Sequence, residues 1–185
     1  MKKLILISLS IAMLLMTAAC GSTDANNGSS NPDSSQSETV DFTGSLPDLI
    51  NQLYEKVPVD IMLLDPTEVE ISDADVLSYY TGLTDASAIK EAFFSEAAVG
   101  SQAYSMAAVR LNDPADAEAV ANAMFEGIDT AKWICVAADS LSVAAIDDIV
   151  ILAMVDSELA PDLDKDLMSA FAEITGKTPV VSLSK

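Results

Sequence analysis

Acidic side chains dominate the chemistry that this sequence can offer. It contains 29 aspartates and glutamates, nine lysines and arginines, and no histidine. Without imidazole, the Ser-His-Asp and Cys-His arrangements that activate nucleophiles are excluded, as are histidine metal sites. Paired carboxylates can hydrolyse glycosidic bonds, but among 29 acids sequence proximity singles out no pair. We therefore predict no catalytic residue and no enzyme, with a carboxylate-based hydrolase as a minor alternative.

One acidic stretch has the spacing of a calcium-binding loop. Asp162, Asp164, Asp166 and Glu173 occupy positions one, three, five and twelve of an EF-hand loop. Position six of that loop needs glycine for its sharp turn, and here it is Leu167. The apolar residues between the acids instead indicate a helix whose first turn is acidic, which the helix dipole favours. We therefore predict no metal site.

Two further motifs fail as reactive sites. The tripeptide 176–178, Gly-Lys-Thr, is the end of a phosphate-binding loop, but Phe171 replaces that motif's first glycine. This segment also runs from helix to strand, so its glycine is predicted to end the helix. Cys135 lies in an apolar run and is predicted to pack as a small apolar residue. No cofactor is predicted. The remaining candidates are aromatic, either core residues or the lining of a ligand groove: Tyr79, Tyr80 and Trp133.

The first twenty residues carry the sharpest functional signal. Lys2 and Lys3 precede the apolar residues 4–16, a segment too short to span a bilayer comfortably and typical of a signal peptide. Small residues at 17–19 then precede Cys20. This arrangement resembles the lipobox of bacterial lipoproteins, in which the cysteine thiol receives a diacylglycerol and the chain is cleaved just before it. The alternative is an ordinary secretory signal with a chance cysteine.

The lipobox resemblance implies where the protein resides. Thr17 stands where leucine is commonest, although small residues are tolerated there. Residues 1–19 are expected to be removed and Cys20 to carry fatty acyl chains such as palmitate. Two acyl chains give the double anchor that stable membrane attachment needs. We therefore expect a lipid-anchored protein on the extracytoplasmic face of the cell membrane, held there through Cys20.

Charge excludes one class of partner. The precursor has a net charge of −20, and removing Lys2 and Lys3 leaves seven basic and 29 acidic residues, a net charge of −22. Nucleic-acid binding needs a basic surface, so no nucleic-acid partner is expected. If Cys20 is lipidated, Cys135 has no disulfide partner. The stability of the domain must then come from its hydrophobic core, and 50% of the residues in the sequence are hydrophobic, which is enough to form one.

Composition divides the mature chain into a tether and one domain. Residues 20–44 comprise the lipidated cysteine and a stretch rich in Ser, Asn and Gly, which predicts a disordered tether. Residues 45–185 are predicted to form a single α+β domain, with a helical N-terminal part at 45–95 and a core of sheet and helices at 96–185. The oligomeric state is not predicted.

Periodicity and capping residues predict the elements of this domain. Ser45 and Asp48 begin a helix whose apolar stripe ends before Pro58, and Ser72 with Asp75 begins another that ends at Gly82. A third helix is predicted from residues 84–85 through 93. Further elements are a strand at 102–111, a helix starting at Asp113-Pro114, strands at 141–146 and 149–155 joined by Asp147-Asp148, a helix at 163–174, and a strand at 179–183. Residues 61–64 are predicted to pack on the core, and residues 131–140 to form a helical continuation or a turn.

From about residue 102 the predicted order is strand, helix, strand, strand, helix, strand. That is the βαββαβ order of ferredoxin-like folds, an antiparallel sheet with helices packed on one face. The short N-terminal helices would cover its edge or its open face. We therefore predict an α+β class.

The chain also resembles small Gram-positive lipoproteins that carry an uncharacterised conserved domain. The resemblance covers residues 46–176 and rests on the lipobox, the polar tether, an acidic helical region and the pattern from 103 onward. It implies an extracytoplasmic lipoprotein of small α+β fold and transfers no binding residue. The leading hypothesis is a non-enzymatic interaction or accessory protein of the cell envelope with a protein partner. The alternative is a small-ligand or cation-binding lipoprotein that serves a transporter or sensor.

Overall fold

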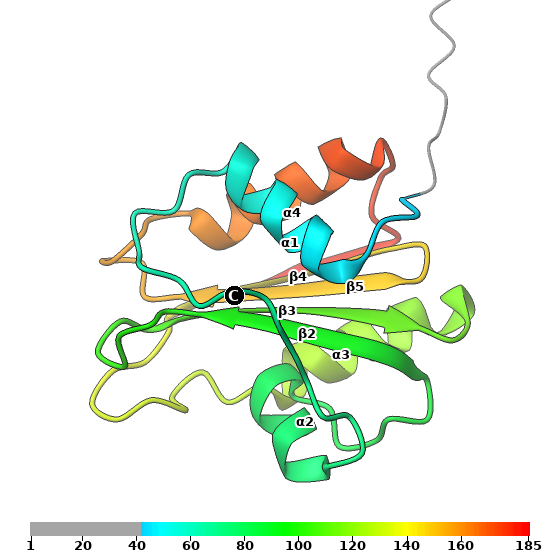
Figure 1. Ribbon diagram of the computed structural model, residues 1–185, viewed down its shortest axis with the longest axis horizontal. Coiled ribbons are helices and arrows are strands. Elements are labelled where there is room, and N and C mark those ends of the chain that lie inside the picture. The colour runs from blue at the N-terminus through cyan, green and yellow to red at the C-terminus, as the bar shows by residue number, and fades with distance from the viewer. Residues whose placement is uncertain (1–41) are drawn as a thin grey trace, which may run out of the picture. The chain divides into compact units, whose positions relative to one another are not determined.

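The computed structural model describes residues 42–185, which form a six-stranded antiparallel sheet with helices on both faces (Figure 1). The predicted α+β class is confirmed. The strand order across the sheet is β1-β2-β3-β5-β4-β6. The strands are β1 (Thr67–Glu68), β2 (Ile89–Glu96), β3 (Tyr104–Leu111), β4 (Ser140–Ile146), β5 (Ile149–Val155) and β6 (Val181–Ser184). The helices are α1 (Leu46–Lys56), α2 (Ala74–Thr81), α3 (Ala117–Gly127) and α4 (Leu163–Thr175), with a short 3₁₀ turn before α3.

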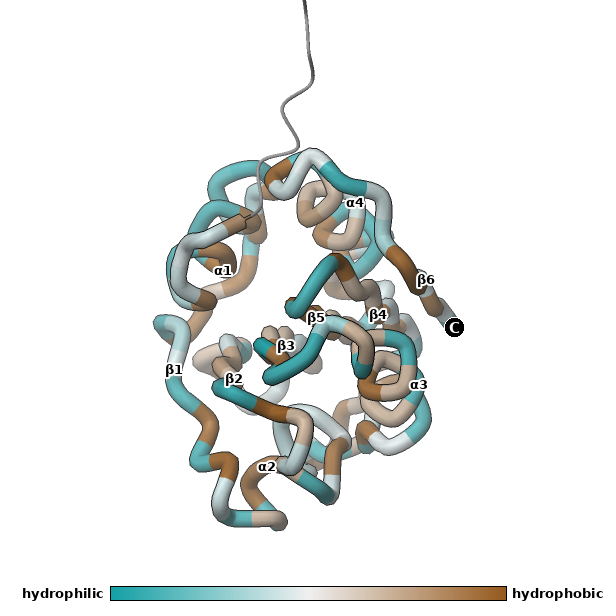
Figure 2. Tube along the Cα trace, turned by 90° about the vertical axis from the view of Figure 1, so that its right-hand side faces the viewer, coloured by the Kyte–Doolittle hydropathy of each residue, from teal (hydrophilic) through white to brown (hydrophobic). Residues whose placement is uncertain are grey.

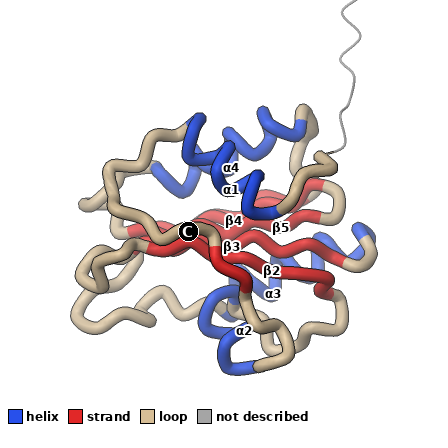
Figure 3. The backbone as a smooth tube through the Cα atoms, in the orientation of Figure 1, coloured by secondary structure: helices blue, strands red, loops and turns tan. Residues whose placement is uncertain are grey.

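Two hydrophobic cores lie on the two faces of the sheet. Helices α2 and α3 pack on one face, and helices α1 and α4 pack on the other (Figures 2 and 3). Successive residues of a strand point to opposite faces, so β3, β4 and β5 supply both cores and are buried almost along their whole length. Residues 42–185 thus supply two packed cores, one on each face of the sheet.

The prediction that helices pack on one face is wrong, and the strand order explains why. β3 and β4 are parallel with β5 between them, whereas β5 and β6 are parallel with β4 between them. Both crossovers therefore step in the same direction across the sheet, although β3 and β5 run in opposite directions. Right-handed crossovers then require α3 and α4 on opposite faces. A ferredoxin-like arrangement would need β6 beside β3, where β2 already pairs.

The predicted helix at 84–93 is also wrong, because most of that segment is strand β2. A helix would place Ile89 and Phe93 on one face, but in the structure a bulge between Ile89 and Glu91 shifts the register of β2 against β3. The two side chains consequently lie in different cores, and the alternation that marks a strand is interrupted. The division at residue 95 therefore cuts through β2, and the N-terminal part is not purely helical.

Local capping signals predicted the helix boundaries well. The Ser45 hydroxyl accepts the backbone N–H of Asp48 at 3.3 Å and donates to its carboxylate at 2.6 Å. Asp113 caps the turn that leads into α3 as predicted, and Gly82 and Gly176 end α2 and α4 in the left-handed conformation. Asp73, rather than Ser72, caps α2. The other strands and helices lie close to their predicted ranges, including the hairpin at Asp147.

Two loop predictions are only partly right. Residues 131–139 begin in a turn, continue through bends and lead directly to β4, so the predicted turn is confirmed and the helical continuation is wrong. Of residues 61–64, Ile61 is buried as predicted, but Met62 is 71% exposed and Leu64 is 45% exposed. The exposure of Met62 and Leu64 follows from the extended backbone of this segment. Leu63 pairs with Ala97 beside the sheet and faces one core, so the side chains of its two neighbours point away from that core.

The strands define two ends of the domain. At the tether end, β3 finishes, the Asp147-Asp148 turn joins β4 to β5, and the chain enters from residue 42. At the distal end, β2 finishes, β3 begins and the 131–139 loop reaches β4. An eight-residue strand spans about 25 Å, so the two ends are well separated.

Candidate functional site

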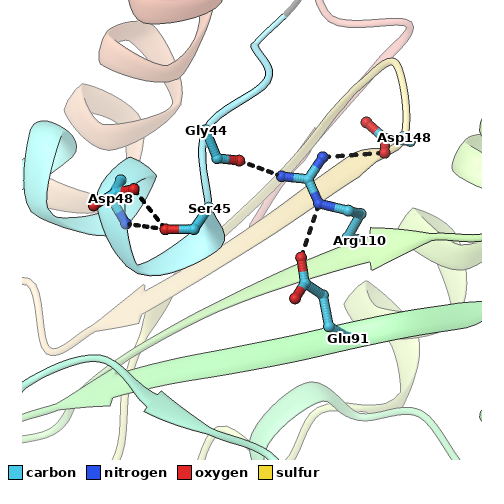
Figure 4. A network of polar contacts seen from close by, with 6 residues as sticks. All are labelled: Gly44, Ser45, Asp48, Glu91, Arg110 and Asp148. Atoms are coloured by element: carbon cyan, nitrogen blue, oxygen red, sulfur yellow. Dashed lines mark hydrogen bonds and ion pairs between the residues drawn. The ribbon is translucent and has the colours of Figure 1, made fainter.

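Arg110, the only arginine in the sequence, organises the tether end (Figure 4). It lies near the end of β3 and is only 9% exposed. Its guanidinium donates to Glu91 at 2.9 Å, to Asp148 at 3.1 Å and to the Gly44 carbonyl at 2.7 Å. Two carboxylates therefore compensate the buried cation, and the third bond fixes the backbone one residue before the Ser45 cap.

A hollow of about 720 Å³ opens beside this arginine. Its volume falls within the range of small-molecule pockets, about 300 to 1,000 Å³. Both charge signs and several apolar side chains line it. The lining residues are Phe42, Thr43, Lys90, Arg110, Leu111, Asn112, Pro114, Asp147 and Asp148.

A second charged cluster lies at the distal end, under α2. The ammonium of Lys132, whose side chain is 2% exposed, lies 2.5 Å from Glu96 Oε1. It also donates to the Ser105 hydroxyl at 3.1 Å and to the Tyr79 carbonyl at 3.2 Å. Burial lowers the pKa of Lys132, and the neighbouring Glu96 carboxylate opposes this shift.

Aromatic rings surround the same ammonium. The Lys132 nitrogen lies 4.4 Å, 5.1 Å and 5.4 Å from the ring centres of Tyr79, Tyr80 and Trp133, within cation–π range. Burial, followed by the Glu96 charge, raises the pKa of both tyrosines, which stay neutral. The three aromatics that the sequence offered as core residues or groove lining are thus gathered around one lysine.

Several exposed apolar side chains lie on segments of the distal end that connect to this cluster. We call Met62, Leu64, Tyr79, Val99 and Ile134 the distal apolar strip. The members are linked through the backbone and Lys132: Ala98 N–H donates to the Met62 carbonyl, and Leu64 N–H donates to Glu96, the partner of Lys132. Tyr79 contacts Lys132 directly, and Ile134, which is 87% exposed, follows two residues later. Another strongly exposed apolar residue, Val180, precedes β6 at the tether end.

The acids of the rejected calcium loop have other partners. Asp164 is fully buried in α4 and accepts the hydroxyls of Ser140 at 2.9 Å and Ser142 at 2.6 Å, so it ties α4 to β4. Asp162 pairs with Lys165 at 2.7 Å. The other two acids, Asp166 and Glu173, lie in α4 itself. Within residues 42–185, no group of three or more His, Cys, Asp or Glu side chains could hold a metal ion.

The prediction that Cys135 packs in the core is wrong. Its side chain is exposed, and its backbone adopts a φ of 70°. The apolar run that suggested burial belongs to the 131–139 loop, in which Ala138 is the one buried apolar residue. The chain leaves regular structure here to bring Lys132 and Trp133 under α2, so the intervening residues face solvent.

The sequence reasoning missed both charged clusters. Arg110 did carry a signal, since a single charged residue within an apolar strand must find partners when the strand is buried. Lys132 carried a weaker sequence signal, which is its position beside the only tryptophan. The acidic partners of Arg110 lie 19 and 38 residues away along the chain and that of Lys132 lies 36 residues away, beyond the reach of local patterns.

Comparisons with known protein families, curated proteins and solved structures found no match. The resemblance to Gram-positive lipoproteins therefore stays a prediction. Cys20 and the predicted signal peptide lie outside the described residues. None of the helices in residues 42–185 combines the length and the apolar composition that a membrane span requires.

Proposed function

We propose that this chain is a lipid-anchored accessory protein on the extracytoplasmic face of the cell membrane. It binds a protein partner there through the distal apolar strip and catalyses no reaction. The resemblance of residues 17–20 to a lipobox supports the location, and the exposure of the distal apolar strip supports the binding role. Small domains rarely leave several large apolar side chains together in water unless they form an interaction surface.

The charge around the strip specifies the partner's chemistry. Exposed acids border this end of the domain, and the described lysine closest to the strip is buried against Glu96. The partner should therefore present an apolar patch flanked by lysines or arginines, and its association rate should fall with salt. The bordering acids are Asp60, Asp65, Asp129 and Asp139.

Lipidation can be tested separately. Replacing Cys20 with serine should move the protein from the membrane fraction to the soluble or secreted fraction, because no acyl chain can be attached. Fractionation followed by immunoblotting measures this, and Cys135→Ser, which keeps the anchor, is the matched control. A Cys20→Ser protein that stays fully membrane-bound after a salt wash would contradict the anchor.

The partner surface can be tested by photo-crosslinking in the intact cell. A photoreactive residue at Ile134 should form a defined protein adduct, whereas one at Val180, equally apolar but at the tether end, should not. Replacing Met62 with lysine should abolish the adduct at 134, because a cation is placed on a surface that we expect to meet a basic partner. Adducts that are identical at both positions, or indifferent to Met62→Lys, would refute the proposed surface.

A further inference from the structure

We propose that the hollow beside Arg110 is a binding site for a small zwitterion that carries both a carboxylate and an ammonium group. The site lies at the tether end, so it is separate from the distal apolar strip. The two roles can therefore succeed or fail independently.

Arg110 and Lys90 form the cationic part of the site. A guanidinium carries five N–H groups, and the bonds to Glu91, Asp148 and Gly44 use three of them. One hydrogen on each terminal nitrogen of this buried side chain therefore remains for another acceptor. A carboxylate accepts such a pair of donors well.

The position of Lys90 also supports a binding site for a carboxylate. It lies at the bulge between Ile89 and Glu91, and bulges often redirect a side chain at a functional site. Within residues 42–185 the other cationic side chains have an acidic or aromatic partner, whereas Lys90 has none. In a chain with a net charge of −20, an unpaired lysine at a hollow is a position for an anionic group.

Asp147 and Asp148 form the anionic part. Asp147 uses Oδ2 for Lys177, and Asp148 uses Oδ2 for Arg110, so one oxygen of each carboxylate remains available. The turn that carries them is a two-residue hairpin loop with Asp147 at a φ of 53°, which is uncommon for a residue other than glycine. Two such oxygens can accept hydrogen bonds from an ammonium group.

The equal number of positive and negative side chains around the hollow favours a zwitterion over an ion of a single charge. The lining contains two cations and two carboxylates, so neither a bare anion nor a bare cation meets a surface of opposite sign. A metal ion is not favoured either, since no suitable cluster of three ligands exists in the described residues. Phe42, Leu111 and Pro114 add apolar contact area for the body of the ligand. Free amino acids and short peptides have this combination of groups.

The test uses the chain from residue 21 onward, which retains both cores, and follows the Asn112 side-chain amide by NMR. The probes are leucine and the dipeptide Ala-Leu, each as the zwitterion, as the N-acetyl derivative and as the C-terminal amide. We expect the zwitterion to bind saturably and each blocked form to bind at least about tenfold more weakly, because each loses one ionic contact.

Lys90→Gln identifies the contact. In this variant the acid and the amide should bind with similar affinity, since the cation that distinguishes them is gone. Lys165→Gln, which removes an equal charge from exposed α4, should bind like the parent. The proposal is overturned if no zwitterion shifts the Asn112 signal at about 10 mM, a concentration that fills even millimolar sites. It is also overturned if the blocked forms bind as well as the zwitterion.

Discussion

Replacing Lys132 with methionine is expected to lower the free energy of unfolding by about 3 to 5 kcal/mol, the usual cost of removing one partner of a buried ion pair. The Glu96 side chain is 12% exposed, and among the described residues its buried Oε1 has no partner other than the Lys132 ammonium. The Lys132 ammonium, 2.5 Å away, therefore compensates the buried negative charge of Glu96. Methionine keeps the contact with the rings of Tyr79, Tyr80 and Trp133 but leaves the carboxylate buried and unpaired. Urea unfolding followed through the fluorescence of Trp133 measures the loss.

Two further variants separate charge from packing. Lys165→Met removes an exposed lysine and should not change the unfolding midpoint. The double variant Lys132→Met with Glu96→Gln should recover part of the loss, since the stranded charge is gone. If the double variant is as unstable as Lys132→Met alone, the effect comes from packing and not from the ion pair.

Elements with a complete local signal could be predicted from sequence. For α1, α3 and the β4–β5 hairpin, an apolar period and a capping or turn residue agree, and each lies where it was expected. Tertiary contacts are not needed to place such elements, because propensity, capping and burial all favour the same structure.

Strand β2 and the layering could not be predicted for a shared reason. The bulge at Lys90 broke the alternation of β2, so the sheet seemed to begin with β3. With β2 absent, the edge of β3 looked free and a ferredoxin-like sheet was the simplest closure. Once β2 occupies that edge, β6 must pair with β4, and the handedness of the crossovers sends α4 to the other face.

The candidate sites divide in the same way. Cys20 follows from residues next to it in the chain, so the sequence alone supports the prediction of lipidation. The hollow at the tether end depends on residues 42–43, 90, 110–114 and 147–148, which only the sheet register brings together. Lys90 and Asp148 give no sign in the sequence that they share a surface.

Gly127→Ala is expected to destabilise the domain by about 2 to 3 kcal/mol, although alanine is the better helix former. Gly127 ends α3 against Gly82, which ends α2. A Cβ at Gly127 would collide with the Gly82 carbonyl oxygen, and the carbonyl carbon would lie 3.1 Å away. These are backbone atoms held by the helix C-cap, so the two helices must move apart and open the core between them.

Two other glycines provide controls that isolate this cause. At Gly100 an added Cβ meets nothing within 4 Å, so Gly100→Ala should leave the unfolding midpoint unchanged. At Gly176 it also meets nothing, but φ is +66°, so Gly176→Ala should cost about 1 kcal/mol through backbone strain alone. Urea unfolding of the three variants should therefore rank Gly127→Ala as the least stable. If Gly127→Ala equals Gly100→Ala, α2 and α3 do not pack closely at this point, because only a close contact between their backbones makes the added methyl group costly.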